Sequence, residues 1–393
     1  MSNIEELIAQ LCPNGVEYVK LGDVVKVLRG KRLTKNKLSE EEKYPVYHGG
    51  LEPLGYYGQS NRIANTVMVI NVGASAGTVG YSSVEFWSSD GCFCLGHSDL
   101  LISRYAFYAL FCHTSILRSK VRVAGIPTLD ASAVESITIP IPPLPIQHEI
   151  VNILDKFTEL QAKLKAELQA RRAQYEYYRN DLLNFENKEV EWSTLGEIGE
   201  FVRGNGLQKK DFIETGVGCI HYGQIYTYYG AFAHKTKTFV SPEFAKKLRK
   251  AQKGDLVIAT TSENVVDVCK TVAWLGDDEI AVSGDAYIYK HNQNPMYLAY
   301  YLQTPMFFDH KKKYMTGTKV IRVSGKDMAK FKIPIPPLAE QNRIVAILDK
   351  FDKLVHDISE GLPAEIEARR KQYEYYRGKL LDFKPIEFDR FEE

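Results

Sequence analysis

Two long stretches of the chain carry apolar residues at helical spacing. The first follows Pro145, and its apolar residues fall three or four positions apart, the period of one helix face. They are Ile150, Leu154, Phe157, Leu160, Leu164 and Leu168. A continuous helix from Gln147 to Phe185 would be roughly 58 Å long. This exceeds the length of an ordinary globular helix and predicts a spacer or a coiled coil.

The second stretch has the same period, with apolar residues at Ile344, Leu348, Phe351, Leu354, Ile358, Leu362 and Ile366. Gly361 and Pro363 weaken a helix at this point, so we expect a kink or a short break, with Pro363 starting a new segment. Two similar helices, each with one apolar face, most simply bury these faces against each other. An antiparallel pair would place the blocks that precede them at opposite ends.

Those blocks, residues 16–138 and 190–332, mix strand-like and helical patterns. The strand-like runs are "TVMVINV" (66–72), "DLVIATT" (255–261) and "EIAVSG" (279–284), and the helical stretches are residues 104–121 and 296–314. The blocks contain many turns and no strict alternation of strand and helix. The pattern therefore predicts two mixed α/β domains.

The chain contains an internal repeat, in which one sequence unit occurs twice. The segment "VEYVKLGDVVKVLRG" (16–30) returns as "VEWSTLGEIGEFVRG" (190–204), "IPIPPLPIQHEIVNILDKF" (139–157) as "IPIPPLAEQNRIVAILDKF" (333–351), and "RRAQYEYYRNDLLNF" (171–185) as "RRKQYEYYRGKLLDF" (369–383). The helical parts keep nearly the same letters, whereas the blocks keep only their edges. Two copies should stay alike where they do the same structural job and differ where each faces something different.

Composition restricts the class of protein only broadly. The chain has 393 residues, of which 45% are hydrophobic and 25% charged, and its net charge is +1. These values are typical of a soluble protein and argue neither for nor against nucleic acid. The six scattered cysteines predict buried free thiols in a reducing compartment. No signal peptide or membrane-spanning run is evident, so we expect a cytoplasmic protein without a membrane partner.

Four loops in each block are candidates for contact with a ligand. They pair as 29–37 with 203–210, 47–50 with 221–230, 71–80 with 259–267, and 122–128 with 311–322. Their Arg, Lys, Asn, Gln, Ser, Thr and Tyr side chains can hydrogen-bond phosphates and base edges. Any soluble domain has polar basic loops, but recurrence at matched positions favours a function. The candidate DNA-binding residues are Arg29, Lys31, Arg32, Lys35, Arg122 and Thr128 in the first block, and Arg203, Asn205, Gln208, Lys209, Lys210, Gln224, Tyr226, Ser262, Asn264, Lys311, Lys312, Lys319 and Arg322 in the second.

The sequence contains no convincing catalytic motif. The Gly-rich run 73–80 lacks the lysine of a phosphate loop, and the nine histidines show no metal-ligand spacing. The string "QNPMY" (293–297) is superficially similar to the Asn-Pro-Pro-Tyr adenine pocket of DNA methyltransferases, but we interpret it as a helix start. We therefore expect no catalytic residue and no metal site.

The whole pattern closely resembles the specificity subunit of type I restriction-modification systems. The resemblance covers essentially the full chain and rests on "LGDVVKVLRG" with "LGEIGEFVRG", on the duplicated proline strings, and on the duplicated "QYEYYR" segments. It implies an α+β fold, with two mixed α/β target recognition domains separated by two long antiparallel, coiled-coil-like helices in a pseudo-twofold repeat. The expected domains are recognition domains 1–144 and 188–338, helical spacers 145–187 and 339–385, and a tail, 386–393.

The resemblance also implies a function. Each recognition domain would read one half of a bipartite site in double-stranded DNA, and the helices would set the spacing between the halves. Two methyltransferase subunits would dock, carrying S-adenosylmethionine for adenine-N6 methylation. Two restriction subunits that use ATP and Mg could add to the complex. This chain would then be non-catalytic and bind no cofactor itself.

The "QYEYYR" segments allow two interpretations. Their tyrosines could pack within the helix pair, or Tyr177, Arg179, Tyr375 and Arg377 could project outward and dock the methyltransferase, since Tyr and Arg are favoured at interfaces. Two other functions also stay open at this point. The chain could be a coiled-coil scaffold with two protein-binding heads, or an enzyme with an unrecognised active site.

Overall fold

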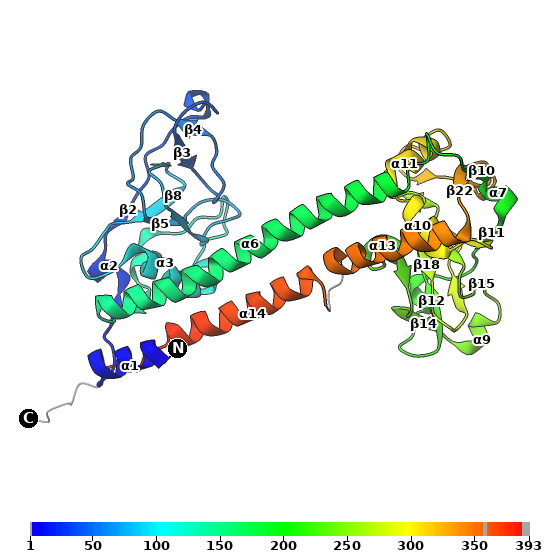
Figure 1. The fold of residues 1–393 in the computed structure, drawn as a ribbon. Helices are drawn as coiled ribbons and strands as arrows, with labels where there is room; N and C mark the ends of the chain where they lie inside the picture. Colours follow the sequence, from blue (N-terminus) through cyan, green and yellow to red (C-terminus); the bar gives the residue numbers. More distant parts are fainter. Residues whose placement is uncertain (1, 357–359, 387–393) are drawn as a thin grey trace, which may run out of the picture. The chain divides into compact units, whose positions relative to one another are not determined.

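The structure is a computed structural model that describes residues 2–356 and 360–386. The chain divides into two compact units, which are described one at a time. Unit 1 comprises Met1–Lys163 with Ile366–Glu393, and unit 2 comprises Leu164–Glu365. Each unit therefore contains one of the two blocks together with parts of both helical stretches (Figure 1). The predicted α+β fold class with its internal repeat is confirmed.

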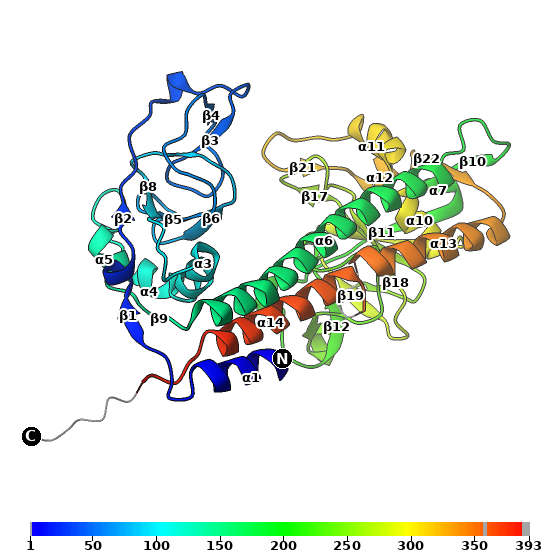
Figure 2. The same cartoon turned by 60° about the vertical axis from the view of Figure 1, so that its left-hand side comes forward.

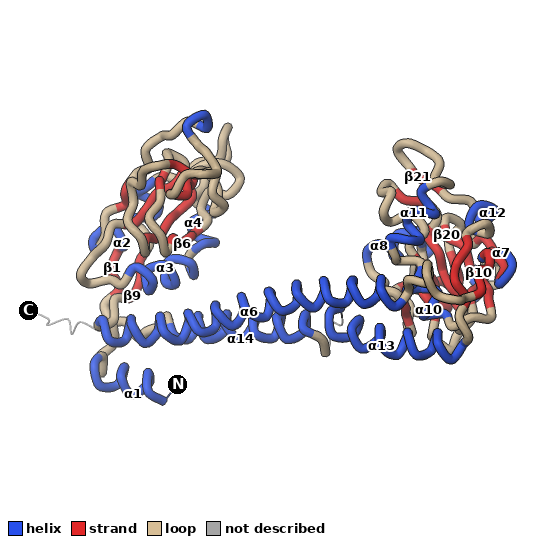
Figure 3. Tube along the Cα trace, turned by 45° about the horizontal axis from the view of Figure 1, so that its top comes forward, coloured by secondary structure: helices blue, strands red, loops and turns tan. Residues whose placement is uncertain are grey.

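Unit 1 is built around a small antiparallel sheet of order β2-β8-β5-β6, with a second sheet β4-β3-β7 and the strand pair β1-β9. Its strands are β1 (Tyr18–Lys20), β2 (Val27–Leu28), β3 (Tyr44–Tyr47), β4 (Tyr56–Tyr57), β5 (Thr66–Ile70), β6 (Val79–Ser82), β7 (Trp87–Ser88), β8 (Cys92–Leu95) and β9 (Thr138–Pro140). Its short helices are α1 (Ser2–Leu11), α2 (Leu21–Val24), η1 (Lys35–Lys37), α3 (Ser103–Cys112), α4 (Thr114–Ser119) and α5 (Ala131–Glu135). Helix α3, seen beside the strands of this unit in Figure 3, contacts β5 and β6. Buried apolar side chains of α3, β5 and β6 form the core.

Unit 2 has a five-stranded sheet β11-β20-β16-β18-β13, a four-stranded sheet β14-β12-β19-β15, and the pairs β10-β22 and β17-β21. Its strands are β10 (Glu191–Thr194), β11 (Gly199–Arg203), β12 (Val217–Ile220), β13 (Phe232–Ala233), β14 (Thr238–Val240), β15 (Lys250–Ala251), β16 (Leu256–Ala259), β17 (Thr261–Ser262), β18 (Thr271–Trp274), β19 (Ile280–Val282), β20 (Ala286–His291), β21 (Ile321–Arg322) and β22 (Lys332–Ile335). Its short helices are α7 (Leu195–Ile198), η2 (Lys209–Asp211), α8 (Tyr222–Thr227), α9 (Pro242–Ala245), α10 (Pro295–Tyr301), α11 (Pro305–Lys312) and α12 (Gly325–Met328).

The long helices follow the predicted pattern, with one difference at the start of the first helix. Helix α6 is continuous over Leu144–Leu182, so it starts before Gln147, because Pro145 is tolerated in a first helical turn. The second stretch is two helices, α13 (Leu338–His356) and α14 (Leu362–Leu380), so the expected break is present. The expected apolar position Ile358 lies outside the described residues.

The helices pair in the antiparallel sense within each unit. In unit 1, Phe157 of α6 stacks on Tyr376 of α14, with ring centroids 5.5 Å apart and an interplanar angle of 27°. In unit 2, Tyr178 of α6 stacks on Phe351 of α13 with the same separation and angle. Figures 1 and 2 show the two helical contacts, α6 beside α14 and α6 beside α13. The repeated segments therefore make the same Phe–Tyr contact in both units.

The proline strings are the last strand of each block followed by a helix start. In unit 1, β9 pairs antiparallel with β1, and in unit 2, β22 pairs with β10. Pro140 and Pro334 each accept a hydrogen bond from a buried tyrosine, Tyr105 at 3.0 Å and Tyr297 at 2.8 Å. The prolines thus stiffen the exit of each block while their carbonyls anchor it to α3 or α10.

A buried glutamine completes each junction. Gln147 is 0% exposed, donates to the carbonyl oxygens of Pro142 (2.8 Å) and Leu100 (2.9 Å), and accepts from the Ile102 amide. Gln341, also 0% exposed, donates to Pro336 O and accepts from the Asn294 amide. One side chain therefore ties the helix start, the proline turn and the segment before α3 or α10 together.

We predict that Gln341→Ala lowers the free energy of unfolding of unit 2 by about 2–4 kcal/mol, because a buried amide and carbonyl lose their partners. Urea unfolding followed by a probe in unit 2 measures the change. Gln169→Ala, at an exposed position of α6, is the matched control and should alter stability by less than about 0.5 kcal/mol. Equal effects of the two substitutions would contradict this role.

Candidate nucleic-acid interface

A glycine sets the course of the first candidate loop in each block. A Cβ on Gly30 would lie 1.7 Å from Ser89 O, and a Cβ on Gly204 would lie 2.2 Å from Ser283 O. Only glycine allows the backbones to approach this closely. An Arg-Gly pair ends the repeated opening segment of each block. Its glycine is therefore a packing requirement that brings the basic loop against the neighbouring strand ends.

Each first loop then makes a short 3₁₀ turn that carries lysines. Lys35 begins η1 and Lys209 begins η2, at corresponding places in the repeat. In unit 2 the turn is capped because Asp211 accepts from the Gln208 amide at 2.8 Å. Lys35, Lys209 and Lys210 are all exposed. The two loops thus present cationic side chains in the same way.

Arginines that the sequence did not single out hold the base of each first loop. Arg62 donates to the carbonyl of Arg29 at 2.7 Å, and Arg249 donates to the carbonyl of Arg203 at 2.6 Å. Arg62 and Arg249 do not fall at matching offsets, so the repeat gave no signal for them. Their shared role depends on folding alone.

The third and fourth candidate loops lie side by side in each block. In unit 2, β17 pairs with β21, so that Thr261 faces Arg322. In unit 1, Thr128 forms isolated bridges to both Val72 and Arg122. Loops that are some 50 residues apart in the sequence therefore form one surface in each unit.

Two polar cavities flank the β17–β21 pair. One, of about 400 Å³, is lined by residues of the first, third and fourth loops, including Arg203, Thr261 and Arg322. The other, of about 340 Å³, includes Tyr226 of the second loop and Asn264 of the third. All four candidate loops of unit 2 thus converge here, with both donors and acceptors, which is the mixture that base edges require.

Several candidates use their polar atoms internally. Gln224 accepts from the His221 amide as part of the cap of α8, and Tyr226 donates to Thr261 O at 2.9 Å. Ser262, which is buried, accepts from the Asn264 amide at 3.0 Å. These residues shape the loops. Arg122 forms an exposed ion pair with Asp130 at 2.9 Å, which leaves its guanidinium at the surface.

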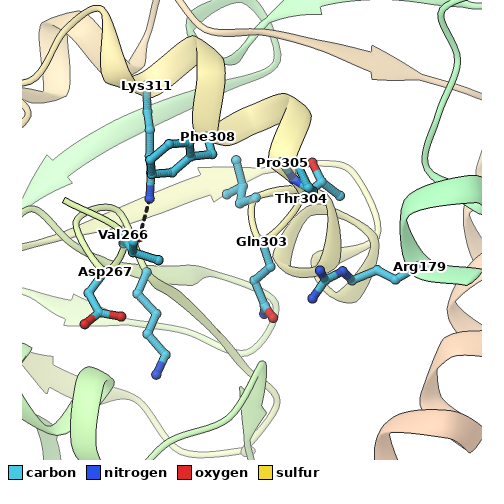
Figure 4. A pocket seen from close by; sticks show the side chains of 10 residues that line it. Arg179, Val266, Asp267, Gln303, Thr304, Pro305, Phe308 and Lys311 are labelled. Atoms are coloured by element: carbon cyan, nitrogen blue, oxygen red, sulfur yellow. Dashed lines mark hydrogen bonds between the residues drawn. The ribbon is translucent and has the colours of Figure 1, made fainter. Parts of the chain in front are cut away.

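Lys311 requires a correction. We expected it to face phosphate, but it is 5% exposed, and its ammonium donates to Val266 O (2.7 Å) and Val268 O (2.6 Å). Figure 4 shows the hydrogen bond to Val266 at the edge of a cavity of about 460 Å³, with Phe308 beside the lysine. Burial lowers the pKa of Lys311. Its role is to hold the loop 263–268, because a buried ammonium with two carbonyl acceptors cannot reach a ligand outside.

The remaining candidates divide by exposure. Half-buried are Thr128, Asn205, Gln224 and Tyr226; exposed are Arg29, Lys31, Arg32, Lys35, Arg122, Arg203, Gln208, Lys209, Lys210, Asn264, Lys312, Lys319 and Arg322. Asn205 also closes the first loop, because it donates to Lys247 O and accepts from the Arg249 amide. The exposed set provides the available donors.

The tyrosine segments of the helices contain both packing and surface residues. Tyr175 is buried, whereas Tyr177 and Tyr375 are 67% and 65% exposed at corresponding places. Arg377 lies over the rings of Phe111 and Tyr373 at 4.9 and 5.1 Å, within unit 1. Arg179 lies over the ring of Tyr175 and lines the cavity of Figure 4. The two tyrosines are therefore the most accessible of the four docking candidates.

Among residues 2–356 and 360–386, no three or more His, Cys, Asp or Glu side chains are grouped so that they could hold a metal ion. Over the same residues, no helix has both the length and the apolar character that a membrane span requires.

Comparisons with known proteins identify the family. The type I restriction modification DNA specificity domain matches residues 13–170 and 187–368. The chain is 39% identical over 262 residues to the Escherichia coli EcoR124I/EcoR124II specificity subunit, a match that covers 63% of each chain. It is 31% identical over 389 residues to a Haemophilus influenzae protein assigned as a type I restriction enzyme specificity subunit, covering 94% of this chain and 96% of that one.

A solved structure agrees on the fold. The type I restriction-modification S subunit from M. genitalium has a TM-score of 0.60 and 20% identity, covering 93% of this chain and 96% of that chain. The chain therefore belongs to the family of type I restriction-modification specificity subunits, with two copies of the family domain. The resemblance inferred from the duplicated motifs is confirmed.

The burial of Lys311 leads to a prediction about salt dependence. Log affinity for duplex DNA falls as log salt rises. Lys210→Met should make this slope less steep by about 1, because an exposed phosphate contact is lost. Lys311→Met removes the same charge but should leave the slope unchanged. Fluorescence anisotropy across a salt series measures both slopes. An equal fall for Lys311→Met would contradict its assignment as a buried support.

Proposed function

We propose that the chain is the DNA-reading, non-catalytic subunit of a type I restriction-modification complex that works in the cytoplasm. Each recognition domain, 1–144 and 188–338, reads one half of a bipartite site in double-stranded DNA. The helical spacers 145–187 and 339–385 set the distance between the halves. The expected tail, 386–393, lies outside the described residues except for Ile386. One observation carries the proposal. In each unit the third and fourth loops come together, and the loops of the two units correspond in place but differ in composition. The helices that support them make nearly identical contacts.

The loop chemistry supports DNA as the ligand. The exposed lysines of the two 3₁₀ turns suit phosphates, and the polar cavities beside β17 and β21 suit base edges. The loops differ between the two blocks although the supports agree. That difference supports reading of two different half-sites by one chain.

The partners follow from the same proposal. Two methyltransferase subunits dock on the helical spacers and carry the S-adenosylmethionine used for adenine-N6 methylation. Two restriction subunits that use ATP and Mg can join the complex. This chain binds none of these cofactors itself, and the absence of a catalytic motif in its sequence is in keeping with that role.

The first test is modification-aware sequencing of cellular DNA, with the gene and its neighbouring methyltransferase gene present or with this gene deleted. A split motif with a fixed gap, adenine-methylated only when the gene is present, is the expected result. Arg322→Ala should relax the specificity of one half-site only, at a cost of about 1–3 kcal/mol in binding. Arg122→Ala, in the corresponding loop of unit 1, is the matched variant for the other half. Unchanged methylation after deletion of the gene would contradict the proposal.

Docking has a separate test. Tyr177→Ala combined with Tyr375→Ala should weaken binding of the methyltransferase subunit by about 2 kcal/mol or more, because exposed tyrosines at interfaces carry much of the binding energy. Affinity for DNA should stay within about 0.5 kcal/mol of its original value. Calorimetry with the purified subunit measures the first and anisotropy the second. Full methyltransferase binding by the double variant would exclude this surface.

A further inference from the structure

The repeat defines corresponding positions in the two units through hydrogen bonds as well as letters. Tyr108 in unit 1 hydrogen-bonds Asp155, and Tyr300 in unit 2 donates to Asp349 at 2.6 Å. With the matching tyrosine bonds to the proline strings, these contacts fix α3 and α10 in the same register. Arg104 of α3 therefore corresponds to a methionine of α10, Met296.

In unit 1 the position is filled by a guanidinium. Arg104 donates from Nε to Asp155 Oδ1 at 2.7 Å and lies over the rings of Tyr81 (4.6 Å) and Tyr108 (5.0 Å). The carboxylate, the aromatic rings and the guanidinium form one closed cluster. The negative charge of Asp155 is balanced within the unit.

In unit 2 the same position is a cavity of about 470 Å³, lined among others by Met296, Asp349, Asp352 and His356. Asp349 corresponds to Asp155, and its arginine partner is replaced by the uncharged, buried Met296. A second carboxylate, Asp352, stands where unit 1 has Thr158. The charge in this place is therefore more negative in unit 2 than in unit 1.

Among the neighbours of the carboxylates, one basic side chain contacts Asp352 and another is paired elsewhere. His356 lies 3.0 Å from Asp352, and Lys353 pairs with Glu360 at 2.6 Å. Burial raises the pKa of Asp349, the hydrogen bond from Tyr300 opposes this, and the charge of Asp352 adds to it. The cavity consequently favours a cation.

We propose that this cavity binds the guanidinium of an arginine from a methyltransferase subunit, so that the partner supplies the group that unit 1 carries itself. The identity of the partner rests on the proposed function. The carboxylates exclude DNA phosphate, and Leu275 and Phe232 provide apolar wall for an arginine stem. Asp349 and Asp352 accept the planar head as Asp155 accepts Arg104.

The asymmetry has a consequence for assembly. The corresponding position in unit 1 is already occupied by Arg104, so two methyltransferase subunits bind with unequal affinity. The subunit that contacts unit 2 gains one buried guanidinium–carboxylate contact and binds more tightly. Loss of such a contact typically weakens binding by about 30-fold or more.

The test is titration calorimetry of the full chain with the purified methyltransferase subunit. Wild type should show two classes of site. Met296→Arg, which fills the cavity as unit 1 does, should weaken the tighter class by about 30-fold or more. Asp352→Asn should weaken it in the same direction without adding bulk. Glu243→Gln, an exposed position of α9, changes the net charge by the same amount and should leave both classes unchanged.

Several outcomes would overturn the inference. Two classes of site that persist unchanged in both Met296→Arg and Asp352→Asn would do so, while an intact methylation pattern would leave the proposed function standing. Binding of spermidine to the chain that Met296→Arg abolishes, with methyltransferase binding unchanged by both spermidine and the substitution, would assign the cavity to a free polyamine. A chain that binds neither methyltransferase nor DNA would overturn both proposals.

Discussion

The buried glutamine at the start of each long helix is the interaction on which the rest of the structure depends. Gln147 and Gln341 have no exposed surface, and each joins three backbone segments through one amide group. A buried amide without partners is costly, so the junction tolerates little rearrangement. Each recognition block is thereby held to its own helix with defined geometry.

This rigid junction explains why the two blocks could diverge. The strand pairs, tyrosine bonds and helix stacking recur in both units, while the loops above them differ in length and composition. Loops on a rigid support can change their side chains without altering the fold. A subunit that reads two different half-sites needs this division between a constant support and a variable surface.

The exchange of Arg104 for Met296 shows that the supports are not fully equivalent. A charge that is balanced internally in one unit is left in the other beside a cavity and a second carboxylate. Carboxylates beside a cavity favour a cation, so a partner that supplies one can complete this position. Symmetric repeats can in this way favour an ordered assembly.

The sequence by itself determined the repeat, the long helices, the break before Pro363 and the family. These features rest on local periodicity, on proline and on repeated letters, which need no knowledge of distant contacts. It also predicted which four loops in each block correspond. The helical stretches 104–121 and 296–314 were less accurate, since each is divided into two helices.

Only the tertiary structure decided which side chains are available. It buried Lys311 under two carbonyl oxygens, gave Arg62 and Arg249 the same supporting role, and joined the third and fourth loops through short strand pairs. It also placed Met296, at the position that corresponds to Arg104, in the lining of a cavity that holds two carboxylates. Burial and hydrogen bonding between residues far apart in the chain set these outcomes, and the local pattern of a sequence carries no information about such contacts.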